Sequence, residues 1–334
     1  MTVAALAAGN PVVLKPAEQT PAVAARLVEA LSAGGLPDGV LGFLPGYGDE
    51  VGARLVEHPD VSFIVFTGSR AVGLSIVELA ARHRPGQRHV KRVVAEMGGK
   101  NALIIDGDAD PDQAVPAAVD SAFSFAGQKC SALSRLIVVD AAYDAVVPRL
   151  IEAAGELQVG HARHMGTQVG PVIDDDAYQR LTKAIGEAPA HGTVAHLSNE
   201  IPGDGWYVGP TVVTEVDRRS ILATDEFFGP LLSVFRVADL DEALALANDT
   251  EYALTAGIFS RSPANIRRAT NELRAGNVYV NRGVTGAVVG RQPFGGFALS
   301  GVGSKAGGPD YLLQFVDPRT VTENTLRQGF APDS

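Results

Sequence analysis

The sequence contains one cysteine, and the residues around it favour a reactive thiol. Cys130 lies in the segment FSFAGQKCSALSR (residues 123–135), with a lysine before it and a serine after it. The segment joins an expected helix to an apolar strand that begins at Leu136. A partly exposed thiol at such a junction, beside a cation, has a lowered pKa, which favours attack by its thiolate. The alternative is a small buried apolar side chain, the commoner role of a lone cysteine.

A glutamate supplies a second candidate for chemistry. The segment VVAEMGGK (residues 93–100) places Glu96 at the end of an apolar strand and just ahead of two glycines. A partly buried carboxylate at such a position can act as a general base. On its own, however, a glutamate at a strand end is usually an exposed surface residue.

Three further segments suit a nucleotide cofactor. In VFTGSRAVG (residues 65–73) a buried strand ends at Gly68, and Ser69 begins a helix whose free N–H groups and dipole suit a pyrophosphate. An ordinary capped helix explains the same pattern. Lys15 and Glu18 follow a parallel strand, at the sheet edge where ligands bind. That carboxylate can accept from the ribose hydroxyls of NAD and would repel a 2′-phosphate, although a solvated ion pair is the alternative.

The third of these segments is Glu-Phe-Phe-Gly-Pro, which begins at Glu226. It places a carboxylate and two aromatic rings before a tight turn, and either ring, including that of Phe228, could instead belong to the core.

The elements that must position these residues alternate between strand and helix with short connections. This alternation indicates an α/β fold with doubly wound parallel sheets, and the pattern changes after Gly98 and Gly99. Strands are expected at residues 11–14, 40–44, 61–66, 92–95, 101–105, 136–139, 231–237, 256–259, 277–280 and 316–326. Helices are expected at residues 21–32, 49–57, 69–83, 110–125, 144–157, 240–247 and 263–273.

Composition excludes several classes of protein. Apolar residues make up 46% and charged residues 20% of 334, which is ordinary for a globular enzyme. A net charge of -10 without a basic run argues against a nucleic-acid surface. One cysteine excludes a disulfide within the chain, so a reducing, cytoplasmic setting is the simplest interpretation. No apolar run approaches the roughly 20 residues of a membrane span.

Taken together, the motifs resemble those of the aldehyde dehydrogenase superfamily, in order and over essentially the whole chain. They are Lys-Pro-x-Glu, Phe-Thr-Gly-Ser, Glu-x-Gly-Gly-Lys, Gly-Gln-x-Cys, Glu-x-Phe-Gly-Pro and Pro-Phe-Gly-Gly. The pairing of the third with the fourth is specific and favours a nucleophilic Cys130. The resemblance implies an aldehyde dehydrogenase-like fold. Its expected parts are a partial doubly wound NAD-binding domain (1–97), an α/β catalytic domain (98–312), and a C-terminal return with an oligomerisation strand (313–334).

Three segments narrow the resemblance to enzymes that act on a small aldehyde acid: residues 126–135, 285–296 and 299–330. They imply NAD-dependent oxidation of L-glutamate γ-semialdehyde, formed from Δ1-pyrroline-5-carboxylate, to L-glutamate in proline catabolism. A dehydrogenase for another small aldehyde acid is the alternative.

The resemblance also implies roles for single residues. Cys130 is the nucleophile that forms a thiohemiacetal and then a thioester, and Glu96 activates the water that hydrolyses it. The residues implied at the cofactor are Gly68 and Ser69 for the pyrophosphate, Lys15 and Glu18 for the adenosine ribose, and Glu226 and Phe228 for the nicotinamide ribose and ring. Those implied at the substrate are Ser131, Gly286 and Ala287 for the α-carboxylate and Phe294 for the aliphatic part. No metal is implied.

The resemblance does not cover the first part of the superfamily's sequence. Roughly its first third, including a Trp-Asn-Phe-Pro motif whose Asn completes the oxyanion hole, has no counterpart in this sequence. We therefore expect a truncated chain that alone is nearly inactive and poorly soluble, whereas its full-length parent is an active homo-oligomer. Two alternatives are a non-catalytic NAD-binding remnant and a cysteine hydrolase, although no histidine pattern supports the latter.

Overall fold

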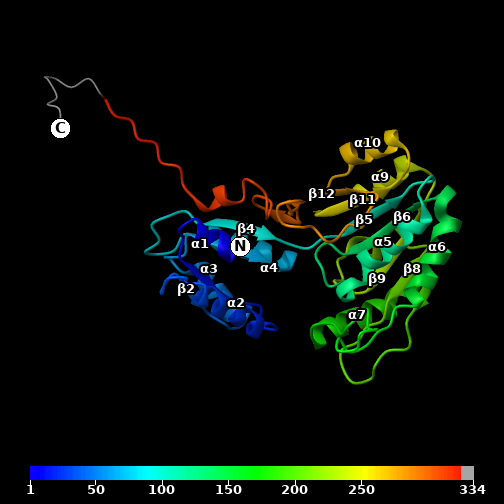
Figure 1. Ribbon diagram of the computed structural model, residues 1–334, viewed down its shortest axis with the longest axis horizontal. Coiled ribbons are helices and arrows are strands. Elements are labelled where there is room, and N and C mark those ends of the chain that lie inside the picture. The colour runs from blue at the N-terminus through cyan, green and yellow to red at the C-terminus, as the bar shows by residue number, and fades with distance from the viewer. Residues whose placement is uncertain (325–334) are drawn as a thin grey trace.

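The computed structural model describes residues 1–324 and consists of two lobes (Figure 1). The first lobe contains the chain up to β4 (Arg92–Glu96), and the second contains most of the rest. The chain crosses between the lobes from β4 to β5 (Asn101–Ile105). It later returns, because β14 (Gly301–Val302) pairs with β4. Two stretches far apart in sequence therefore meet beside Glu96.

The first lobe contains two small sheets. In one, β1 (Val12–Leu14) pairs in parallel with β2 (Leu41–Phe43). In the other the order is β14-β4-β3, with β3 (Phe63–Thr67) parallel and β14 antiparallel to β4. The helices are α1 (Thr2–Ala7), α2 (Pro21–Ala33), α3 (Ala53–Glu57) and α4 (Arg70–Ala81). Here the doubly wound pattern is incomplete, and the expected helix over 49–57 begins as a π-helical turn, Gly48–Gly52.

The second lobe is built on a seven-stranded sheet of order β12-β11-β5-β6-β9-β8-β7. All neighbouring strands are parallel except β7, which is antiparallel to β8. The other six strands are β6 (Leu133–Val139), β7 (Thr193–Leu197), β8 (Thr211–Thr214), β9 (Leu231–Val237), β11 (Thr255–Phe259) and β12 (Asn277–Val280). A separate short pair joins β10 (Tyr252–Ala253) to β13 (Phe297–Ala298).

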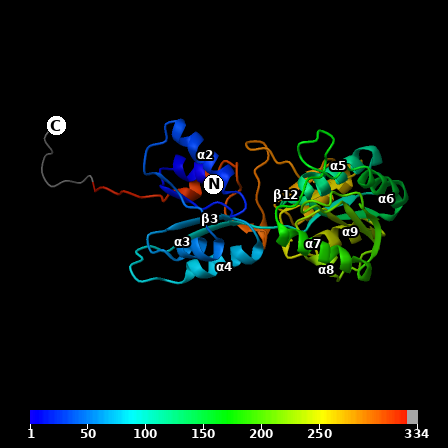
Figure 2. The ribbon, with the colours of Figure 1, turned by 90° about the horizontal axis from the view of Figure 1, so that it is seen from below.

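Helices cover both faces of this sheet, and each face has its own core. The helices are α5 (Pro111–Phe123), α6 (Asp140–Gly155), α7 (Asp175–Glu187), α8 (Ile221–Thr224), α9 (Leu240–Asn248) and α10 (Pro263–Glu272). Helices α5 and α6 lie on one face and α8 and α9 on the other (Figure 2). Side chains of β5 alternate between the cores: Leu103 packs in the core that contains residues of α5 and α6, and Ile104 in the core that contains residues of α8 and α9. Burial on both faces explains why the central strands are continuously apolar.

These elements confirm the α/β class and the parallel-dominated sheet. Helix α7 and strands β7 and β8 were not predicted, although α7 begins at the clear N-cap Asp174. Residues 316–324, expected to begin an edge strand, extend away from the first lobe and pair with no described strand (Figure 1). The remainder of that expected strand lies outside the described residues. Among the helices of residues 1–324, none combines the length and apolarity needed to span a membrane.

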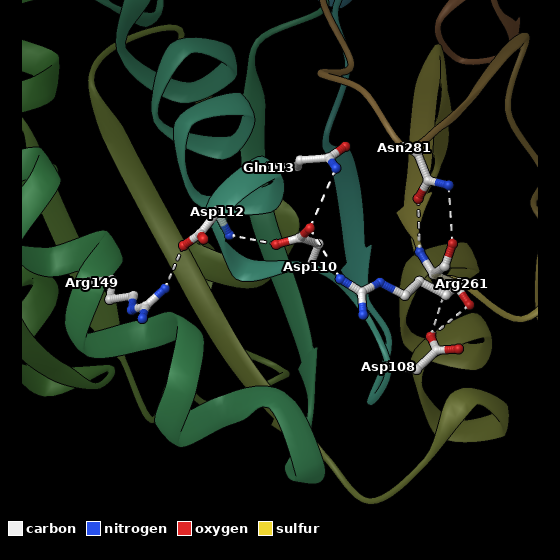
Figure 3. A network of polar contacts seen from close by, with 8 residues as sticks. Asp108, Asp110, Asp112, Gln113, Arg149, Arg261 and Asn281 are labelled. Carbon is white, nitrogen blue, oxygen red and sulfur yellow. Dashed lines mark hydrogen bonds and ion pairs between the residues drawn. The ribbon is translucent and has the colours of Figure 1, made fainter.

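The carboxyl edge of the large sheet is held by polar side chains that bind one another (Figure 3). Asp108, after β5, accepts from the backbone N–H of Arg261, after β11, at 3.0 Å. The Arg261 guanidinium donates to Asp110 at 3.1 Å, and Asn281, after β12, donates to the Ser260 carbonyl at 3.0 Å. Because these groups satisfy one another, the network ties the ends of three strands together.

Candidate active site

Cys130 and Glu226, two of the predicted site residues of the second lobe, lie with Lys100 at the opposite, amino edge of the sheet. Cys130 precedes β6, Glu226 precedes β9, and Lys100 immediately precedes β5. These three strands are neighbours in the sheet, so the segments before them are also neighbours. In the first lobe, by contrast, Glu96 ends β4 and Gly68 follows β3. The candidate site therefore lies where carboxyl ends of one lobe meet amino ends of the other.

The turn formed by Gly98 and Gly99 brings Glu226 and Cys130 next to the chain that follows Glu96. The backbone N–H of Gly99 donates to Glu226 Oε1 at 3.0 Å. A Cβ on Gly98 would lie 1.8 Å from Glu226 Oε2, and one on Gly99 would lie 2.9 Å from the Cys130 carbonyl oxygen. Only glycine permits this approach on both sides, which is the physical reason for the Gly-Gly pair.

A constrained backbone presents Cys130. Phe125, Ala126 and Gly127 all have left-handed φ values, of 59°, 54° and 66°. The first two are not glycine, so the conformation is strained, and such strain is concentrated at functional sites. Asn101 fixes the other side, since its amide donates to the carbonyls of Cys130 and Ala132, each at 2.8 Å.

The electrostatic environment of Cys130 differs from the prediction. Burial, and then the carboxylates of Glu226 and Glu96, raise the pKa of the thiol to about 11. Two backbone N–H groups, of Ser131 and of Cys130 itself, act in the opposite direction. The predicted lowering by the neighbouring cation is therefore wrong, and the Lys129 ammonium donates to Ser124 Oγ at 2.9 Å.

Glu96 has the protonation behaviour that general-base chemistry at neutral pH requires. Burial raises its pKa to about 7, while Lys305 and the Gly296 N–H lower it. Its Oε2 is buried and has no hydrogen-bond partner among the described residues. A base with a pKa near the working pH transfers protons most effectively.

The structure gives different surroundings to the two phenylalanines after Glu226, whose roles the sequence could not distinguish. Phe227 packs against both cores of the second lobe. Phe228 is 40% exposed and has a left-handed φ of 52°, so its ring is available to a planar ligand. Burial raises the pKa of Glu226, and the Gly99 N–H, Lys100 and Arg70 oppose that rise.

Lys100 was not predicted as a site residue, although it closes the Glu-x-Gly-Gly-Lys motif. It is only 3% exposed, and its Nζ donates to the Asp225 carbonyl at 2.5 Å and lies 5.3 Å from the centre of the Phe227 ring. Burial lowers its pKa to about 7. Lys100 thus holds the segment that carries Glu226.

The remaining cofactor candidates lie in the first lobe. Ser69 caps α4 by accepting from the Val72 N–H at 3.3 Å, and the next residue, Arg70, pairs across the lobes with Glu251 at 2.6 Å. Lys15 and Glu18 pair with each other at 2.9 Å after β1. They follow a strand of the separate two-stranded sheet, and no hydrogen bond or ion pair between described residues links them to Ser69 or Glu226.

The substrate candidates occupy two places. Ser131 is buried beside Cys130. Gly286 has a left-handed φ of 79° and open space at its Cβ position, and neither its N–H nor that of Ala287 donates to a described residue. Phe294 is bridged to Ala306, and a Cβ on the following Gly295 would lie 3.0 Å from Glu96 Oε1. This loop therefore reaches Glu96.

Comparison with known sequences identifies the relatives of the chain. The model of the aldehyde dehydrogenase family matches residues 1–321. The 1-pyrroline-5-carboxylate dehydrogenase of Geobacillus kaustophilus (strain HTA426) is 48% identical over 322 residues, 96% of this chain and 62% of the relative. That of Bacillus cytotoxicus is 47% identical over 323 residues, 97% of this chain and 63% of the relative. The chain thus spans less than two thirds of the length of these curated relatives.

Comparison with solved structures also finds proteins named for 1-pyrroline-5-carboxylate dehydrogenase or proline utilization. Proline utilization A (PutA) from Bdellovibrio bacteriovorus, inactivated by N-propargylglycine, superposes with a TM-score of 0.95 and 53% identity, over 99% of this chain and 34% of that one. A 1-pyrroline-5-carboxylate dehydrogenase from Thermus with bound NAD gives a TM-score of 0.90 and 46% identity, over 92% of this chain and 60% of that one.

Proposed function

The chain belongs to the aldehyde dehydrogenase family, and from this premise we propose that it catalyses the NAD-dependent oxidation of L-glutamate γ-semialdehyde to L-glutamate. The observation that supports this most is the Gly98–Gly99 turn, which joins the Glu96 strand to the segments of Cys130 and Glu226. These contacts support a single site in which Cys130 would act as nucleophile, Glu96 as base and Glu226 as the partner of a ribose. The names of the relatives supply the substrate class.

NAD would be held by groups from both lobes. The N-terminus of α4, with Gly68 and Ser69, suits a pyrophosphate, because a helix begins there with free N–H groups. Glu226 suits the nicotinamide ribose and the exposed Phe228 suits the ring, while Lys15 and Glu18 would take the adenosine ribose. When bound, NAD supplies the acceptor for the hydride that leaves the substrate carbon.

Cys130 and Glu96 divide the remaining chemistry. The Cys130 thiolate bonds to the aldehyde carbon, and after loss of hydride that carbon is held as a thioester. Glu96 removes a proton from water, the water oxygen bonds to the thioester carbon, and the sulfur leaves as thiolate. The pKa of Glu96, near 7, lets it accept this proton and release it again at neutral pH.

Selectivity for an aldehyde acid is assigned to Ser131 and to the free N–H groups of Gly286 and Ala287, which would bind the α-carboxylate. The left-handed Gly286 lets the backbone approach an anion without a Cβ in the way. Phe294 would pack on the aliphatic part of the substrate.

The function is tested by adding L-glutamate γ-semialdehyde and NAD to the chain and following NADH by absorbance, with Cys130→Ser as the control. We expect a small NADH signal that is lost in Cys130→Ser. NAD binding without NADH formation would favour a non-catalytic remnant. Hydrolysis of an activated ester with no NAD-dependent oxidation would favour a cysteine hydrolase.

The substrate assignment needs a separate test, in which Ser131→Ala is compared on two aldehydes. We expect KM to rise more for the glutamate semialdehyde than for propanal, because only the former carries an α-carboxylate. An equal effect on both would contradict the assignment of Ser131 to the α-carboxylate and, with it, the proposed substrate.

A further inference from the structure

The carboxylate of Glu96 is incompletely satisfied. Within residues 1–324, its Oε2 is buried with no hydrogen-bond partner. Leaving a buried acceptor unpaired is unfavourable, so such an atom calls for an explanation. The question is which nearby group can compensate a negative charge at this position.

Lys305 meets Glu96 at Gly295. The antiparallel bridge between Phe294 and Ala306 lays residue 305 against residue 295. A Cβ on Gly295 would lie 3.0 Å from Glu96 Oε1 and 3.4 Å from Cγ of Lys305. Glu96 Oε1 and Lys305 Cγ are therefore separated by no more than the sum of these two distances. The lysine stem and the carboxylate are therefore neighbours across a glycine.

The ammonium of Lys305 is positioned but not fully used. It donates to the Gly276 carbonyl, and it lies 5.6 Å from the centre of the Phe297 ring. No ion pair within 4.0 Å joins it to Glu96 among the described residues. Because an ammonium has three donors, two N–H groups remain for a water or for the carboxylate. Burial lowers the pKa of Lys305, and Glu96 opposes that effect.

The charge of Glu96 also affects the pKa values of two other titratable groups. Glu96 contributes to the raised pKa of Tyr311, whose hydroxyl is also buried and without a partner in the described chain. It contributes in the same way to the raised pKa of Cys130. Neither group supplies a positive charge, so Lys305 is the cation that faces the base.

We propose that Lys305 acts through Glu96, holding it as a carboxylate so that it can take the proton of the attacking water. Lys305 keeps its own protons and forms no covalent bond. The role rests on the proposed function of Glu96, but the electrostatic coupling between the two residues does not. Lys305 is thus a positioning residue for the hydrolytic half of the reaction.

The experiment titrates Glu96 directly in the full chain, labelled with 13C at glutamate Cδ. The Glu96 signal is assigned by its loss in Glu96→Gln. Lys305→Met should raise the pKa of Glu96 by about one pH unit, as expected on removing an opposite charge at this range. Lys305→Arg should keep the original titration. Lys183→Met, which removes the same charge from an exposed helix position, should leave Glu96 unchanged.

The enzymatic readout is the pH profile of hydrolysis of the Cys130 thioester. In Lys305→Met its acid limb should move to higher pH by the same amount, with the rate restored at high pH and by the arginine variant. An unshifted Glu96 titration in a folded Lys305→Met chain would overturn the proposal. If the Glu96 titration shifts but the unsubstituted chain shows no hydrolysis that depends on Glu96, the electrostatic coupling is confirmed and the proposed function of Glu96 fails.

Discussion

The backbone N–H of Gly99 donates a hydrogen bond to Oε1 of Glu226 over 3.0 Å. This bond joins the turn between the lobes to the segment that precedes β9, and it places Glu226 within electrostatic reach of Cys130. The bond depends on the absence of side chains at the turn, because Gly98 is pressed against the same carboxylate.

Gly98→Ala is therefore expected to displace Glu226. The added Cβ would lie 1.8 Å from Glu226 Oε2, so the carboxylate or the turn must move. We expect a loss of about 1–3 kcal/mol in the free energy of unfolding and weaker NAD binding. Denaturant titration and calorimetry measure the two effects. Gly186→Ala, in α7 with open space around it, should instead stabilise the chain by about 0.5–1 kcal/mol.

Glu96 should carry a stability cost that depends on pH. Its pKa is raised in the folded chain, so folding favours the protonated form and stability falls as pH rises from about 4.5 to about 7. At pH 8 the free energy of unfolding of Glu96→Gln should therefore exceed that of the unsubstituted chain by about 1–2 kcal/mol, after allowing for solvent screening. The two chains should be equally stable near pH 4. Greater stability of the parent at pH 8 would contradict the raised pKa.

The same substitution should slow catalysis. Removing a general base typically reduces the rate by about 10²–10⁴-fold. In the parent, hydrolysis of the thioester should decline as pH falls through about 7, because Glu96 then becomes protonated. A profile that stays flat down to pH 5 would indicate that another group is the base.

Alkylation reports the environment of Cys130, the single cysteine of the chain. Since Glu226 helps to raise the pKa of the thiol, Glu226→Gln should increase the rate of reaction with iodoacetamide at pH 8. The increase should disappear well above pH 11, where both chains carry the thiolate. Mass spectrometry of quenched samples gives the rates, and equal rates at pH 8 would exclude this influence of Glu226.

Arg135 is expected to be a structural residue rather than a site residue. It is 1% exposed, and its guanidinium donates to the carbonyls of Lys100, Leu246 and Ala247, the last two at the end of α9. Arg135→Met should cost about 2–4 kcal/mol, because several buried carbonyls lose their donor. Arg163→Met, at an exposed loop position, should change stability by less than about 0.5 kcal/mol.

The sequence allowed most of the fold to be predicted and candidate site residues to be proposed, because both depend on local patterns. Apolar runs identified β5, β6 and β9, and spaced motifs made Cys130 and Glu96 the candidates for the nucleophile and the base. Strand β14 escaped prediction, since a two-residue strand has no measurable periodicity. The order of strands in the first lobe depends on this distant segment, so it could not be inferred from local pattern.

Properties that arise from distant contacts were predicted less well. The pKa of Cys130 was expected to fall because Lys129 is adjacent in sequence. It rises because the fold buries the thiol and brings two carboxylates near it. Lys305 went unnoticed for the same reason, since only the return of the chain to the first lobe brings it to Glu96.

We propose that Cys130 forms a thioester during oxidation of the aldehyde and that Glu96 is needed to hydrolyse it. Intact-mass spectrometry of Glu96→Gln, quenched after mixing with NAD and L-glutamate γ-semialdehyde, tests it most directly. We expect a mass increase of one glutamyl acyl group on Cys130 that requires NAD. A chain that stays unmodified while the parent forms NADH, or that carries the adduct on another residue, would contradict it.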